Sequence, residues 1–195
     1  MDYKDLRKLA VRNFFSTKDL AQVLGIKPES ARVLCSRYVK KSLFVRLKKN
    51  FYILEEKWRN LAADEKLEIA NSLQVPSYIS FMTALAWHEI TTQVPRNFFE
   101  NASLKRSARF AIDGNSFNYY KLKKGLYFDF IKKNNIFIAT KEKAFVDSLY
   151  LYSFGKYKID VDSLDIKKLD KAKIKKIIRV FPKKTRDVVG KICGI

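Results

Sequence analysis

The sequence predicts an α+β protein, with an N-terminal winged helix-turn-helix followed by a mixed α/β C-terminal domain that holds a small, mostly antiparallel sheet. Three features predict this architecture: two short helical segments joined at a glycine, a β-hairpin pattern directly after them, and short strands between residues 98 and 139. A chain of 195 residues can hold a small domain joined to a medium one. We expect the winged domain in residues 1–56 and the second domain in residues 57–195, beginning with a helical connector over 57–75.

The first part of the chain carries helix signals in order. Residues 3–13 place apolar side chains at helical spacing. A second helix is expected after Ser16, a residue type favoured at helix N-caps, and Gly25 ends it in the manner of a left-handed C′ glycine. The third helix is expected to begin at Pro28, because proline suits the first helical position, and to run to about Lys41. The short connection between the second and third helices is typical of a helix-turn-helix.

The third helix and the hairpin supply the rest of the winged pattern. Two β-prone runs, 43–47 and 51–54, flank Lys48-Lys49-Asn50, and asparagine tolerates the positive φ that tight turns require. A hairpin in this place is typical of the winged form of the motif. The helix before it has an inward apolar stripe at i, i+3, i+4, i+7 spacing, made of Ala31, Leu34, Cys35 and Tyr38.

The second part of the chain mixes helices and strands. Residues 78–90 are expected to form a helix opened by Ser77 or Ser80, and short strands separated by turn residues follow between residues 98 and 139. Thr140 is expected to cap a helix that runs from residue 141 to about residue 152. The remainder is expected to form two lysine-rich helices separated near Pro182.

Charge is the strongest compositional signal. The chain has 40 Lys and Arg residues against 20 Asp and Glu residues, a net charge of +20. Residues 1–54 carry 13 basic and 4 acidic side chains, and residues 152–195 carry 13 and 5. A polyanion is the natural partner, because each cation placed on a phosphate releases condensed counterions. A proteome that uses lysine as its default solvated residue would give the same excess, so charge alone leaves that alternative open.

The surface of the winged domain points to double-stranded DNA. Arg can pair bidentately with guanine, Ser can donate or accept, and Val can contact a thymine methyl group. The residues expected to read base edges lie on the third helix: Ser30, Arg32, Val33 and Arg37. The residues expected at phosphates or in the minor groove are Lys18, Lys40, Lys41, Arg46, Lys48 and Lys49. The alternative is a basic winged module that makes protein contacts only.

Several segments, in order along nearly the whole chain, resemble the AbiEi-type antitoxins of abortive-infection, type IV toxin–antitoxin systems. The most specific of them is IATKEKAFVDSLYL, residues 138–151. The other matching segments are Phe15 to Leu20 with Leu24-Gly25-Ile26, the wing end Asn50-Phe51-Tyr52, PSYISFMTALAWHEITTQVP over 76–95, and IIRVFPKKTRDVV over 177–189. Two positions depart from the family pattern: Lys49-Asn50 stands where the wing usually has Arg-Gly, and Lys141 stands where a proline usually precedes the Glu-Lys pair.

The resemblance implies that the chain is an antitoxin and a transcriptional autorepressor. The winged helix would bind the operon's own promoter, at inverted repeats, and the C-terminal domain would counteract a cognate nucleotidyltransferase toxin. In the matching C-terminal segment the motif residues are Glu142, Lys143 and Asp147. Asp147 falls one helical turn beyond Lys143, so an ion pair within the domain is the favoured interpretation of these residues, and contact with the toxin is the alternative.

The sequence predicts no enzyme, metal or cofactor. The single histidine, His88, has no cysteine or carboxylate cluster at ligand spacing around it, and the chain has no glycine-rich phosphate loop. Ser153-Phe154-Gly155 before Asp160-Val161-Asp162 resembles the metal-binding pattern of nucleotidyltransferases, but in the wrong order and without a third carboxylate on a later strand. Turn and capping roles are therefore expected for these acids.

The expected function is that of a cytoplasmic antitoxin and autorepressor. A free-standing winged-helix transcription factor is the alternative, and a nucleotidyltransferase-like enzyme is disfavoured. Cys35 and Cys193 lie far apart with no CxxC spacing, which favours a reducing compartment. The apolar runs are shorter than the roughly 20 residues of a membrane helix, and the first residues lack the apolar core of a secretory signal.

Overall fold

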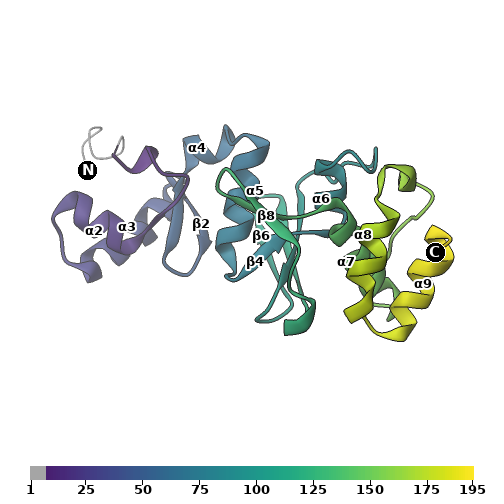
Figure 1. Cartoon of the computed structure of the whole chain (residues 1–195). Helices are drawn as coiled ribbons and strands as arrows, with labels where there is room; N and C mark the ends of the chain where they lie inside the picture. Colours follow the sequence, from purple (N-terminus) through teal and green to yellow (C-terminus); the bar gives the residue numbers. More distant parts are fainter. Residues whose placement is uncertain (1–7) are drawn as a thin grey trace. The chain divides into compact units, whose positions relative to one another are not determined.

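The computed structural model describes residues 8–195, and the contacts among them divide the chain between Ile69 and Ala70 into two compact units (Figure 1). These are called the first and second unit below. The helix predicted over residues 3–13 lies partly outside the described residues; within them, residues 8–10 are helical.

The first unit has the winged helix-turn-helix architecture that the sequence predicts. Its elements are β1 (Phe15–Ser16), α2 (Thr17–Leu24), α3 (Pro28–Lys40), β2 (Phe44–Lys48), β3 (Phe51–Leu54) and α4 (Glu55–Arg59). The three strands form an antiparallel sheet in the order β1-β3-β2. Strand β1 was not predicted, because two residues are too few to show an alternating pattern.

The core of the first unit joins both helices to the hairpin. Leu34 and Tyr38 pack against the buried cluster, so the inward stripe predicted for α3 is confirmed. The rings of Phe15 and Phe44 meet edge to face with centroids 5.0 Å apart. The buried cluster comprises Leu9, Phe15, Leu20, Ala21, Ala31, Cys35, Phe44 and Tyr52.

The predicted connector over residues 57–75 is helical. It contains most of α4 and all of α5 (Ala63–Leu73), and the division between the units falls within α5. The last turn of α5 belongs to the second unit, where the Tyr119 hydroxyl donates to the Ala70 carbonyl and the Asn71 side-chain oxygen accepts from the Phe137 N–H at 2.6 Å.

The second unit is built on a six-stranded sheet in the order β6-β7-β5-β4-β9-β8. Three of its five neighbouring pairs are antiparallel, while β5 runs parallel to β7 and β4 runs parallel to β9. The strands are β4 (Ser77–Ile79), β5 (Phe98–Ser103), β6 (Ala108–Ile112), β7 (Asn115–Lys121), β8 (Phe130–Lys133) and β9 (Ile136–Ala139).

Helix α7 is the central helix of the second unit. It contacts α6, α8, α9 and β9, and 10 of its 13 residues are buried. The helices of this unit are α6 (Phe81–Trp87), α7 (Lys141–Ser153), α8 (Lys171–Ile177) and α9 (Lys183–Cys193), with 3-10 turns η1 (Lys124–Leu126), η2 (Ile166–Lys168) and η3 (Ile178–Val180). None of the helices within residues 8–195 is long and apolar enough to cross a membrane.

The prediction of a helix over residues 78–90 is wrong at its start. Ser77–Ile79 form β4, and the helix begins only after Ser80. Short apolar runs fit a helix or a buried strand equally well. Residues 77–79 form a strand here because they pair with both β5 and β9. The later expectations are confirmed: the Thr140 side chain caps α7, accepting from the Lys143 N–H at 3.4 Å, and Pro182 directly precedes α9.

Candidate nucleic-acid interface

The turn between α2 and α3 is fixed by three local devices. Ser16 caps α2 in a capping box, in which its hydroxyl accepts from the Asp19 N–H and the Asp19 carboxylate accepts from the Ser16 N–H. Gly25 ends α2 at φ 62°, a left-handed conformation, and the Ile26 N–H donates to the Ala21 carbonyl. Helix α3 then starts directly at Pro28. Together these devices set the direction in which α3 leaves the turn.

The exposed face of α3 carries all four residues predicted to read bases. Arg32 and Arg37 lie about 140° apart around the helix axis and border this face from opposite sides. Val33, 60% exposed, lies between them. Ser36 lies there too and is exposed, so it is as well placed as Ser30 to reach a base edge, although it was not among the four residues expected to do so.

The wing is anchored to α3 and to the start of α2. The Leu43 N–H donates to the Tyr38 carbonyl at 2.9 Å, and the Thr17 N–H donates to the Asn50 carbonyl at 3.3 Å. Asn50 adopts φ 63°, so it takes the left-handed conformation at this turn, where the resembling family usually has glycine. The Lys48 ammonium lies over the Phe51 ring, 4.3 Å from its centroid.

The cations of this surface are exposed and uncompensated. Among residues 8–195, the ion pairs of the first unit join Asp19 to Arg12, Glu65 to Lys57 and Glu55 to Arg59, and these three cations lie outside α3 and the wing. Cations without a partner carboxylate stay available for phosphate groups. No ion pair within the described part of the chain engages the exposed Lys18, Arg32, Arg37, Lys40, Lys41, Arg46 or Lys49, which we call the cationic surface.

In the second unit, two of the three motif residues that the sequence analysis singled out on the segment 138–151 lie inside the core. Lys143 and Asp147 on α7 are both completely buried and form an ion pair. The second carboxylate oxygen of Asp147 accepts from the Tyr78 and Ser80 hydroxyls, each at 2.9 Å. Burial lowers the pKa of Lys143 and raises that of Asp147, and the charge of each residue opposes the shift of the other.

Aromatic rings enclose the buried ammonium group. The Lys143 Nζ lies 5.2 Å from the ring centroid of Phe128, 5.4 Å from that of Phe181 and 5.6 Å from that of Tyr78. Ring faces attract cations, so these rings compensate for part of the hydration free energy that Lys143 loses on burial. These contacts, from α7, β4 and two loops, make the ion pair a structural element of the domain.

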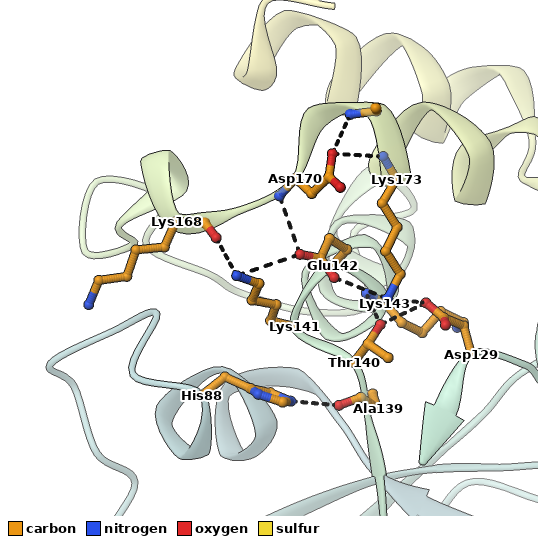
Figure 2. Close-up of polar contacts among 11 residues, drawn as sticks. His88, Asp129, Ala139, Thr140, Lys141, Glu142, Lys143, Lys168, Asp170 and Lys173 are labelled. Carbon is orange, nitrogen blue, oxygen red and sulfur yellow. Dashed lines mark hydrogen bonds and ion pairs between the residues drawn. The ribbon is translucent and has the colours of Figure 1, made fainter.

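The third motif residue, Glu142, joins α7 to the start of α8 (Figure 2). Its carboxylate, 3% exposed, lies 3.2 Å from the Lys173 ammonium and accepts from the Asp170 N–H at 3.2 Å. Lys173 also lies 3.3 Å from Asp129, which accepts from the Thr140 hydroxyl that caps α7. The motif therefore fixes the first turn of α7 against neighbouring segments.

Sequence reasoning missed the partners of Asp147. Tyr78 and Ser80 were expected within or at the start of a helix, and β4 places them beside α7 instead. A buried aspartate needs hydrogen-bond donors, but the donors here are 67 and 69 residues away. A signal based on spacing along one helix cannot find such partners.

The residues considered for catalysis have local structural contacts. The His88 Nε2 lies 2.8 Å from the Ala139 carbonyl, so it carries the proton, and burial lowers the pKa of His88. The Ser153 hydroxyl donates to the Tyr150 carbonyl, and the Asp160 side chain accepts from the Asp162 N–H at 3.2 Å, in a turn. Within residues 8–195, no group of three His, Cys, Asp or Glu side chains could hold a metal ion.

The sequence matches no protein-family model and no curated protein. The fold is similar to the crystal structure of the RV2827C protein from Mycobacterium tuberculosis, with a TM-score of 0.58 and 12% sequence identity. The likeness covers 97% of this chain and 74% of that chain. At this identity it shows the fold alone.

Proposed function

We propose that this chain is an antitoxin and transcriptional autorepressor of a type IV toxin–antitoxin operon. The observation that carries the DNA-binding half is the cationic surface: seven exposed cations of one winged unit lack a partner carboxylate in the described residues. The toxin-directed half rests on the family resemblance of the segments in the second unit.

The winged unit would engage a duplex at two places. Helix α3 would enter the major groove, where Arg37 can reach a guanine and Val33 a thymine methyl group. The wing would place Arg46 and Lys49 on phosphates or in the adjacent minor groove. Contacts to phosphates set affinity and the few contacts to base edges set sequence preference, so the two sets of residues can be tested separately.

A salt titration of promoter binding tests the first half. If about six phosphates are contacted, the logarithm of the affinity falls against the logarithm of the salt concentration with a slope near −5. Reversal of Arg46, Lys48 and Lys49 to Glu should reduce that slope by about three and weaken binding to all sequences alike. The matched control reverses Lys175, Lys176 and Lys191, exposed cations of the second unit, and should keep the wild-type slope. A slope near zero, or no retardation of upstream fragments in a gel-shift assay, contradicts the proposal.

Co-expression with the nucleotidyltransferase toxin that the proposal places in the same operon tests the second half. The wild-type chain should restore growth, and the full chain with the three wing reversals should restore growth equally while failing to repress its promoter. Promoter binding without any rescue would instead indicate a free-standing transcription factor.

A further inference from the structure

Two cavities on the second unit form a site that the proposed function does not use. Their volumes are about 610 and 590 Å³, and Tyr120 and Lys156 line both. Each volume falls in the range of pockets for small organic ligands. The first cavity lies between the start of α6, β5 and the segment after α7, and the second lies between the end of β7 and the end of α7.

A buried carboxylate faces the first cavity. Glu100 on β5 is only 2% exposed, and no ion pair in residues 8–195 neutralises it. One of its oxygens accepts from the Tyr157 hydroxyl at 2.8 Å and the Met82 N–H at 3.1 Å, and the other accepts from the Tyr120 hydroxyl at a long 3.4 Å. The Thr83 N–H also donates to this carboxylate. The contact from Tyr120 is long and therefore weak, so a better-placed donor from a ligand can replace it at the second oxygen.

Aromatic rings surround this carboxylate. The rings of Tyr120 and Tyr157 lie edge to face, 5.6 Å apart, and both pack against Phe81. Phe98 at the first cavity and Phe154 at the second are 36% and 44% exposed, so parts of their rings are open to solvent. Exposed ring faces beside a polar group suit a planar heterocycle, because stacking adds to the hydrogen bond.

Lysines occupy the rims of both cavities. Lys156 and Lys158 line the first cavity, and Lys121, Lys123 and Lys156 line the second. All four are exposed, and none forms an ion pair within the part of the chain that the structure describes. This arrangement selects for anionic groups on the ligand.

We propose that these cavities bind a nucleotide unit, with an N–H or amino group of the base on Glu100, the base among the aromatic rings, and the phosphate at the four lysines. A simple anion would satisfy the lysines but would bring no donor to the weakly bonded oxygen of Glu100. A cationic ligand would satisfy Glu100 but be repelled by the lysines. A planar ring with N–H donors on one side and an anion on the other meets both requirements. A free mononucleotide and the end of a single strand share this chemistry.

Calorimetric titration of the full chain tests the ligand class. AMP, CMP and GMP, whose bases carry amino groups, should bind about tenfold or more tightly than ribose phosphate, which has no base. A trinucleotide with a terminal phosphate separates the two sources: clearly tighter binding than the mononucleotides assigns a strand end, and equal binding assigns a free nucleotide. The trinucleotide is also measured on the chain with the three wing reversals, which should bind it as the wild type does.

Variants of the cavities test the assignment of each group. Glu100→Gln should weaken the three amino-bearing nucleotides about tenfold and leave ribose phosphate unchanged, because an amide is a weaker acceptor than a carboxylate. The pair Lys156→Glu and Lys158→Glu should weaken every phosphate ligand about tenfold or more. The matched control, Lys132→Glu with Lys133→Glu on β8, makes the same charge change outside the cavities and should have no effect. The proposal is overturned if no nucleotide binds, or if ribose phosphate binds as tightly as the nucleotides. It is also overturned if the control variant loses as much affinity as the Lys156→Glu and Lys158→Glu pair.

Discussion

The cationic side chains of the first unit and those around α7 in the second unit differ in exposure and in ion pairing. On α3 and the wing, the cations stand in solvent without carboxylate partners among the described residues. On α7, Lys143 is completely buried against Asp147 and three aromatic rings. An exposed unpaired cation contributes little to stability and is free to bind a phosphate. A buried pair cannot lose one partner without a large loss of stability. The difference separates charges that are available to a partner from charges that stabilise the fold.

The largest expected effect comes from breaking the buried pair. Asp147→Ala leaves the Lys143 ammonium buried without its counter-charge and removes the acceptor of the Tyr78 and Ser80 hydroxyls. The free energy of unfolding should fall by about 3–5 kcal/mol. Urea denaturation measures it, on the transition of the second unit if the two units unfold separately and otherwise on that of the whole chain.

A double variant separates charge from packing at the same place. Lys143→Met combined with Asp147→Leu replaces the pair by apolar side chains of similar volume and should recover the part of the lost stability that is due to the uncompensated charge. The Tyr78 and Ser80 hydroxyls still lack their acceptor in this variant, so recovery should be incomplete. Lys141→Met, a half-exposed neighbour on the same helix, should change stability little. If Asp147→Ala lowers the free energy of unfolding no more than Lys141→Met does, the distinction between buried and exposed charges is contradicted.

The next effect is a dependence of stability on pH that originates at Glu100. Burial raises the pKa of this carboxyl to about 7 from an ordinary value of 4.5, so the folded state holds a proton that the unfolded state has already released. The free energy of unfolding should therefore fall as the pH rises from 4.5 to 7, by about 3 kcal/mol. Glu100→Gln should remove this fall from the measured profile. The exposed Glu89→Gln should keep it, and a wild-type profile in Glu100→Gln would contradict the assignment.

A smaller effect is expected for single side chains at the proposed DNA interface. Arg37→Ala should cost about 1–3 kcal/mol of binding to the preferred promoter site and relax the preference at one base pair, because it removes one contact to a base edge. Lys41→Ala should weaken preferred and scrambled sites equally, since a phosphate contact carries no sequence information. Fluorescence anisotropy on both sites distinguishes the two outcomes. A uniform loss in Arg37→Ala would assign that residue to the phosphates.

Local signals predicted the first unit well, and long-range contacts limited the prediction of the second. Ser16, Gly25 and Pro28 act within one or two turns of chain, so their types alone mark the helix ends, and the exposed face of α3 follows from its periodicity. The strand β4 and the donors to Asp147 depend on segments more than 20 residues away, which no local pattern encodes. Glu100 was missed for the same reason. The sequence predicts that it lies in a strand, but the tyrosine hydroxyls that donate to it come from β7 and from the segment after α7.

The smallest expected effect tests whether the local devices of the first unit act through stability or through recognition. Ser16→Ala removes one half of the capping box of α2 and should lower the free energy of unfolding by about 1 kcal/mol. The unit should stay folded at low temperature, and the substitution leaves every cation of the cationic surface in place. DNA affinity should therefore stay within about twofold of the wild type. Ser16→Asp, which keeps a side-chain acceptor at the N-cap, should restore the stability. A large loss of DNA affinity with unchanged stability would instead place Ser16 itself on the interface, beside Lys18 at the start of α2.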